Sequence, residues 1–183
     1  MLTISHHDPD YWTEHVCRAM GTTVRIIVGE CPRPLLAWAT DELERLESSW
    51  SRFRVESELS SLNASTGEPV AVSDVLWSAL QRCDHLWRAT EGAFDPTVLD
   101  ALERWGYDRS FERVNRDDPS PVAAATAEQR GWRHVTLDRG SHCVRLDAGV
   151  RIDLGGIGKG LAADRIAQGL VDRGARTACV SMG

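Results

Sequence analysis

The chain has 183 residues, of which 42% are hydrophobic, and it carries seven tryptophans and a net charge of −6. Such a chain can bury the core of about one domain, while its acidic balance and lack of a basic run exclude a typical nucleic-acid surface. It has no stretch of membrane-helix length, and its first residues lack the pattern of a signal peptide, so we expect a cytoplasmic protein without a membrane partner. The five widely spaced cysteines fit reduced thiols better than a disulfide framework or a CxxC metal site.

We expect residues 1–14 to form a polar N-terminal tail and residues 15–183 to form one domain or most of one. Alternating apolar residues predict a strand from His15 to Gly29, in which Gly21 marks a bulge or a close approach of the backbone. Met20 is either a core residue beside this bulge or a residue that faces a ligand, and the local pattern does not decide between the two.

Two amphipathic helices follow, each with an apolar face of leucines and other large side chains. Proline favours the first position of a helix, so the first helix is predicted to begin at Pro34 and to end near Trp50. Ser73 is a good N-cap for the second helix, which ends towards Gly92.

Two polar segments border these helices. Ser57 is a good N-cap for a short surface helix that runs to Asn63, although its exposed serines and acid could equally bind a polar ligand. After the second long helix, Pro96 holds Asp95 extended. The neighbouring Phe94 and Asp95 would suit a planar ring with polar edges, whereas a turn capped by Asp95 is the alternative with more local support.

A short helix is predicted from Leu99 to Trp105, followed by an exposed, irregular stretch over residues 109–127. A hairpin then begins at Trp132, turns near residues 139–141 and returns to Leu146.

The C-terminal part reads as a strand, a glycine-rich turn, a helix and a further buried strand. Apolar alternation predicts the first strand up to Leu154, and helical spacing begins at Leu161 and ends at Gly174. The last strand covers residues 177–182.

The glycine-rich turn is the strongest candidate for a ligand site. Its glycines would let backbone N–H groups approach an anion at the start of the helix, and Lys159 adds a cation, so that a phosphate would be well held. Asp153 could accept a hydrogen bond from a ligand or lie close to a metal. The alternative is a tight turn packed on a helix, with Lys159 in solvent. The spacing fits neither the P-loop nor the complete dinucleotide fingerprint.

Five motifs in this order resemble those of the FAD:protein FMN transferases, the ApbE family. They are Met20-Gly21-Thr22, Ser57 to Ser60 with Asn63, Gly92 to Val98, Trp105-Gly106-Tyr107, and Asp153 to Gly160. The resemblance implies an α+β fold of mixed β-sheet with covering helices. It also implies an enzyme that binds FAD with a divalent metal, usually Mg²⁺, and transfers FMN to a Ser or Thr of an acceptor protein with release of AMP. An FAD pyrophosphatase that yields FMN and AMP, or a non-catalytic flavin-binding fragment, are the alternatives.

The resemblance also assigns residues by similarity. Those that would contact FAD are Met20, Phe53, Ala93, Phe94, Asp95, Asp153 and Lys159. The Gly156 carbonyl would be one metal ligand. Asn63 matches a position that influences the balance between transfer of FMN to a protein and hydrolysis of FAD. Members of the family continue for a further domain-scale stretch that supplies other metal ligands. We therefore expect residues 15–183 to be the N-terminal part of a flavin transferase domain that lacks its C-terminal third, and we assign no catalytic residue.

Overall fold

The computed structural model describes residues 12–30, 34–65, 67–107 and 131–183. The chain divides into two compact units, one of residues 1–45 with 159–183 and the other of residues 46–158. The irregular stretch expected at 109–127 lies outside the described residues, as does most of the expected tail.

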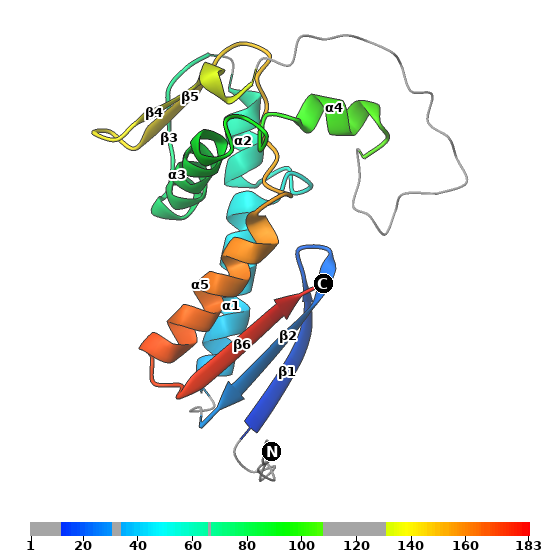
Figure 1. Cartoon of the computed structure of the whole chain (residues 1–183), viewed down its shortest axis with the longest axis vertical. Helices are drawn as coiled ribbons and strands as arrows, with labels where there is room; N and C mark the ends of the chain where they lie inside the picture. The colour runs from blue at the N-terminus through cyan, green and yellow to red at the C-terminus, as the bar shows by residue number, and fades with distance from the viewer. Residues whose placement is uncertain (1–11, 31–33, 66, 108–130) are drawn as a thin grey trace. The chain divides into compact units, whose positions relative to one another are not determined.

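The first unit contains a three-stranded sheet with the order β1-β2-β6 (Figure 1). Its strands are β1 (Trp12–Ala19), β2 (Thr22–Gly29) and β6 (Thr177–Met182), and both neighbouring pairs are antiparallel. Strand β1 already starts at Trp12, so residues 12–14 belong to the sheet and not to the expected tail.

The single strand predicted from His15 to Gly29 is wrong, because a hairpin divides it. Met20 and Gly21 connect β1 to β2, and their φ angles are 50° and 68°. Two consecutive residues with positive φ form the tight turn that matches the twist of antiparallel strands. The alternation continues on both sides of the turn, which is why the pattern alone looked like one strand.

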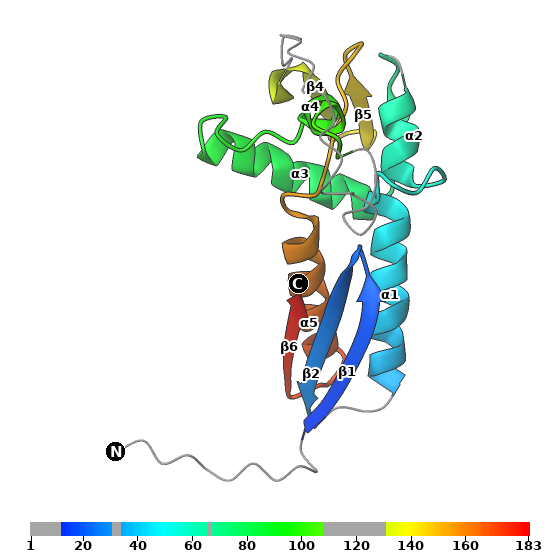
Figure 2. The ribbon, with the colours of Figure 1, turned by 90° about the vertical axis from the view of Figure 1, so that its right-hand side faces the viewer.

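Helices α1 (Pro34–Trp50) and α5 (Gly158–Asp172) contribute the covering layer of this unit, and Figure 2 shows both on the same side of the sheet. Val24, Ile26 and Val28 of β2 are completely buried. Their alternation therefore directs one face of the strand into the core. The helices bury Ala39, Leu43, Ala162, Ile166 and Leu170.

Two expectations for the C-terminal elements need correction. Helix α5 begins at Gly158, so Lys159 and Gly160 lie inside its first turn and not in a loop before it. Strand β6 was predicted to be buried, but its residues alternate between exposed and half-buried. The physical reason is that β6 is at one edge of the sheet in the described part of the chain, with β2 as its neighbour.

The second unit contains a small sheet with the order β3-β5-β4, again with antiparallel pairs. Its strands are β3 (Val70–Ala71), β4 (Val135–Asp138) and β5 (Cys143–Leu146), and a 3-10 turn, η3 (Trp132–His134), precedes β4. Its helices are α2 (Glu58–Ala64), α3 (Asp74–Ala89) and α4 (Leu99–Arg104). The three predicted helices and the predicted hairpin are thus confirmed. Among the helices that the structure describes, none has the length and apolar character needed to cross a bilayer.

The strand predicted to lead into the glycine-rich turn is wrong. Strand β5 ends at Leu146, a turn with Gly149 at φ 78° follows, and residues 150–154 have no strand pairing. Val150, Ile152 and Leu154 are nevertheless buried, with exposed fractions of 4%, 0% and 4%. The apolar alternation therefore predicted correctly which residues are buried, but it did not predict that the segment lacks strand structure.

Candidate functional site

The centre of the candidate site is the segment of residues 150–157 in the second unit, in which residues 150–154 are neither helix nor strand and residues 155–157 form a turn. The Asn63 side chain donates a 2.8 Å hydrogen bond to the Ile152 carbonyl and accepts one of 2.8 Å from the Ile152 N–H. The Asp153 N–H donates to the Pro96 carbonyl at 2.8 Å. These bonds satisfy backbone groups that a neighbouring strand would otherwise pair. Three of the family-like motifs therefore meet at this segment.

The Asp153 carboxylate is 9% exposed and is held from two sides. Its Oδ2 lies 2.6 Å from Nε of Arg52, whose side chain is 7% exposed. Its Oδ1 accepts a 2.7 Å hydrogen bond from the Gly155 N–H. A buried charge needs both an opposite charge and hydrogen bonds, and Asp153 has both.

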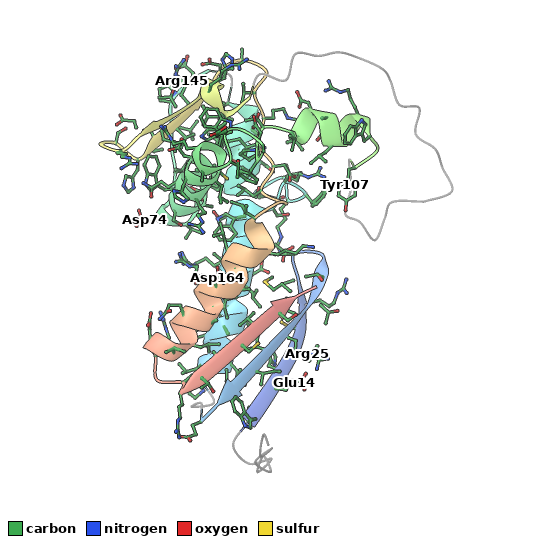
Figure 3. The ribbon with its side chains drawn as sticks, in the orientation of Figure 1. Glu14, Arg25, Asp74, Tyr107, Arg145 and Asp164 are labelled. Atoms are coloured by element: carbon green, nitrogen blue, oxygen red, sulfur yellow. The ribbon has the colours of Figure 1, made fainter. Side chains whose placement is uncertain are left out.

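Arg52 also orders the aromatic side chains beside this carboxylate. The guanidinium carbon lies 4.1 Å from the centroid of the Phe53 ring and 5.7 Å from that of Tyr107. Arg52 Nη2 donates a 2.6 Å hydrogen bond to the Tyr107 carbonyl. Both residues are exposed, at 46% for Phe53 and 36% for Tyr107, and Figure 3 shows Tyr107 just beyond α4. Arg52 was not identified from the sequence, and the only hint was its place next to Phe53.

Helix α4 is tied to the same segment by Arg151. Its guanidinium contacts Asp100 at 2.9 Å and Glu103 at 2.7 Å, both on α4. The hydrogen bond to Glu103 raises the pKa of the Arg151 guanidinium above its usual value. This pairing fixes the helix that precedes the Trp105-Gly106-Tyr107 motif.

The Ala93-Phe94-Asp95 motif lies in the same unit, but the Asp95 side chain bonds to the protein itself. Its Oδ1 accepts from the Thr97 N–H at 2.9 Å and the Thr97 hydroxyl at 2.6 Å, and its Oδ2 accepts from the Trp132 N–H at 3.2 Å. This is the turn capped by Asp95 that the local pattern favoured. Ala93 is exposed and Phe94 is half-buried. A contact of any of these residues with FAD stays a prediction.

Phe94 and Gly156 are brought together by the fold. A Cβ atom added to Gly156 would lie 3.4 Å from the Phe94 ring, at the short end of ordinary van der Waals contact. The Phe94 ring therefore lies close to the backbone of the glycine-rich turn. The assignment of the Gly156 carbonyl as a metal ligand stays a prediction. Over residues 12–30, 34–65, 67–107 and 131–183, no group of three or more His, Cys, Asp or Glu side chains could hold a metal ion.

Met20 and Lys159 belong to the first unit. Met20 is half-buried in the turn between β1 and β2, and Lys159 is exposed as the second residue of α5. Lys159 is also the single lysine of the whole sequence. A cation among the unpaired N–H groups of a helix start can hold an anion. Their contacts with FAD remain predictions.

Comparison with known proteins decides the family. A sequence profile described as the ApbE family matches residues 20–183. This chain belongs to the ApbE family. The resemblance inferred from the five motifs is therefore confirmed.

The chain is similar to curated FAD:protein FMN transferases, but it spans only part of them. It is 33% identical to that of Treponema pallidum over 148 residues, which cover 77% of this chain and 40% of the relative. It is 29% identical to that of Haemophilus influenzae over 149 residues, which cover 77% of this chain and 42% of the relative. The chain thus matches about two fifths of the length of these relatives.

Solved structures confirm the α+β flavin transferase fold. The ApbE protein of Thermotoga maritima superposes with a TM-score of 0.80 at 30% identity, over 94% of this chain and 57% of that chain. The flavin transferase ApbE of Vibrio cholerae gives 0.82 at 28% identity, with the same coverage of both chains. Here too the match extends over little more than half of the known structures.

Proposed function

We infer that this chain is the N-terminal part of an FAD:protein FMN transferase and that it holds FAD for transfer. The observation that carries this inference is the meeting of Asn63, Pro96 and Asp153 at one segment, because it builds three family motifs into a single site. The names of the curated relatives support the same reaction. In this reaction an acceptor Ser or Thr hydroxyl forms a bond to the FMN phosphorus, the pyrophosphate bond breaks, and AMP leaves.

The proposed FAD contacts follow from the chemistry of each group. Exposed aromatic surface at Phe53 suits a planar ring, and Asp153 can accept further hydrogen bonds because each carboxylate oxygen has two acceptor sites. Met20, Ala93, Phe94 and Asp95 are proposed to complete the contacts with the nucleotide. Lys159 would attract the pyrophosphate by its charge.

We also propose that the reaction depends on a divalent cation and that this cation is Mg²⁺. A bound Mg²⁺ would neutralise charge that develops on the phosphates. Mg²⁺ prefers oxygen ligands in octahedral geometry, and the Gly156 carbonyl is one such oxygen. Among the described residues, no group of three or more His, Cys, Asp or Glu side chains could complete that set. Mg²⁺ usually keeps waters and substrate phosphates among its ligands, so the phosphates of FAD would supply some of the oxygens. A cytoplasmic setting and an acceptor protein as partner also belong to this proposal.

Lysine footprinting tests the proposed FAD site directly. Lys159 is the single lysine, so a reagent that acetylates amines can modify only the Lys159 side chain and the N-terminal amine. Mass spectrometry then measures the extent of acetylation at each of the two sites. FAD with Mg²⁺ should slow the modification of Lys159 and leave that of the N-terminal amine unchanged. Unaltered Lys159 acetylation at saturating FAD would contradict the assignment.

Affinity measurements complete the test. Titration with FAD, followed by flavin fluorescence and thermal unfolding together, should show saturable binding and a raised melting temperature. Asp153→Ala and Lys159→Ala should weaken the binding, whereas Arg176→Ala, which removes an exposed partner of Glu30, should not. Incubation with an acceptor protein then separates the reactions: covalent flavin shows transfer, free FMN with AMP shows hydrolysis, and unchanged bound FAD shows a binding module.

A further inference from the structure

Arg52 contacts three groups of the candidate site at once. Its Nε pairs with Asp153 at 2.6 Å, its Nη2 donates to the Tyr107 carbonyl at 2.6 Å, and its guanidinium carbon lies 4.1 Å from the Phe53 ring centroid. The guanidinium is rigid and planar, so these contacts fix one another's directions. A lysine at this position has a single charged atom and could not make all three contacts.

The pair between Arg52 and Asp153 is more deeply buried than the other ion pairs seen among the described residues of this unit. The two side chains are 7% and 9% exposed, whereas the pair between Arg88 and Asp84 on α3 joins side chains that are 70% and 21% exposed. An exposed pair is screened by water and contributes little. A buried pair cannot separate without leaving a charge unsatisfied, so its geometry is strongly maintained.

We propose that Arg52 is a positioning residue of the FAD site, which orients the Asp153 carboxylate and orders the rings of Phe53 and Tyr107. It acts through these neighbours and need not touch FAD itself. Arg52 directs Asp153 Oδ2, while the Gly155 N–H takes Oδ1, so the carboxylate has one orientation from which to accept a ligand hydrogen bond. This inference deepens the proposed function and, as far as FAD is concerned, rests on it.

The test compares four variants of the chain, namely Arg52→Gln, Arg52→Lys, Asp153→Asn and the double variant Arg52→Gln with Asp153→Asn. The matched control is Arg88→Gln, which removes an arginine from an exposed pair in the same unit. We expect Arg52→Gln to raise the Kd for FAD about tenfold or more, because Asp153 would lose the charge-assisted hydrogen bond that sets its orientation. Arg52→Lys should recover only part of this loss, and Arg88→Gln should stay within about twofold of the wild type.

The energetic coupling between Arg52 and Asp153 shows whether Arg52 acts by orienting Asp153 or only by stabilising the fold. If Arg52 acts largely through Asp153, Arg52→Gln should raise the Kd for FAD by a smaller factor in the Asp153→Asn background than in the wild-type background. Losses that add independently would overturn the proposal. Wild-type affinity in a folded Arg52→Gln variant would also overturn it.

Amide hydrogen exchange gives a readout that needs no ligand. The Gly155 N–H donates to Asp153 Oδ1, so Arg52→Gln should accelerate its exchange by about tenfold or more, while amides in α3 keep their rates. Unchanged Gly155 exchange, or equal acceleration throughout α3, would overturn the proposal. If the wild-type chain fails to bind FAD, the proposed function fails for this chain, and Gly155 exchange still decides the role of Arg52. If Arg52→Gln does not fold, Arg52→Lys provides the same comparison with the charge retained.

Discussion

The two units each bury a carboxylate, but they hold it in different structural settings. In the first unit, Glu42 of α1 is 7% exposed and lies between Arg45 of the same helix at 2.8 Å and Arg165 of α5 at 2.6 Å. In the second unit, Asp153 lies in a segment without helix or strand, and its backbone depends on Asn63 and Pro96.

This difference shows which structure can tolerate the loss of one side chain. The backbone around Glu42 is held by regular helical hydrogen bonds, so removing the carboxylate leaves both helices intact. The backbone around Asp153 uses an amide side chain where a sheet would use a neighbouring strand. The second arrangement should therefore be the more sensitive to a single substitution.

Replacing Asn63 by leucine should have the largest effect. Both polar groups of Ile152, a residue with 0% exposure, would lose their partners. Leaving two buried backbone groups unsatisfied costs about 2–4 kcal/mol of unfolding free energy. Chemical denaturation measures this loss.

The matched control for Asn63→Leu is Gln168→Leu on α5. Gln168 also uses its amide, but its partner is the exposed Asp172 side chain, at 2.7 Å. Its substitution should change the unfolding free energy by less than about 0.5 kcal/mol. Equal losses in the two variants would show that the Asn63 amide does not replace a strand.

The role of Asn63 also explains what the sequence could and could not predict. Helices α2 and α3 begin directly after Ser57 and Ser73, as predicted, because a capping serine acts on N–H groups only three residues away. The wrong strand at residues 150–154 arose because its hydrogen-bond partner lies 89 residues away, where no local pattern records it.

The same reasoning applies to the candidate site. Asp153 was a candidate because it directly precedes the glycine-rich turn, and Phe53 was identified through the family resemblance, which compares motifs along the chain. Arg52 was missed because its role is set by a buried partner and by two rings that the fold brings to it. The hairpin at Met20 was missed because methionine is not the usual residue for a turn with positive φ.

Replacing Glu42 by glutamine should have an intermediate effect that depends on pH. The hydrogen bond from Arg45, reinforced by Arg165 and opposed by burial, lowers the pKa of Glu42 from 4.5 to about 2. The charged carboxylate thus stabilises the folded state. Because Arg45 and Arg165 are partly exposed, we expect Glu42→Gln to cost about 1–3 kcal/mol at neutral pH.

The pH dependence follows from the direction of this pKa change. A carboxylate whose pKa is lower in the folded state contributes its full stability above the unfolded value of 4.5 and loses it as the pH falls through about 2. The difference between wild type and Glu42→Gln should therefore be constant from pH 7 to about 5 and shrink towards pH 2. Denaturation at several pH values measures it, and a difference that grows in acid would contradict this account.

Replacing Glu14 by glutamine should have the smallest effect and sets the baseline for both buried pairs. Glu14 of β1 lies 2.5 Å from Arg25 of β2, but the Arg25 and Glu14 side chains are 57% and 46% exposed (Figure 3). Water and salt screen such a pair, so removing it should lower the unfolding free energy by less than about 0.5 kcal/mol. This difference should disappear at high salt concentration. Unfolding free energies at low and high ionic strength measure this. If Glu14→Gln cost as much as Glu42→Gln, burial would not be what distinguishes the ion pairs of this chain.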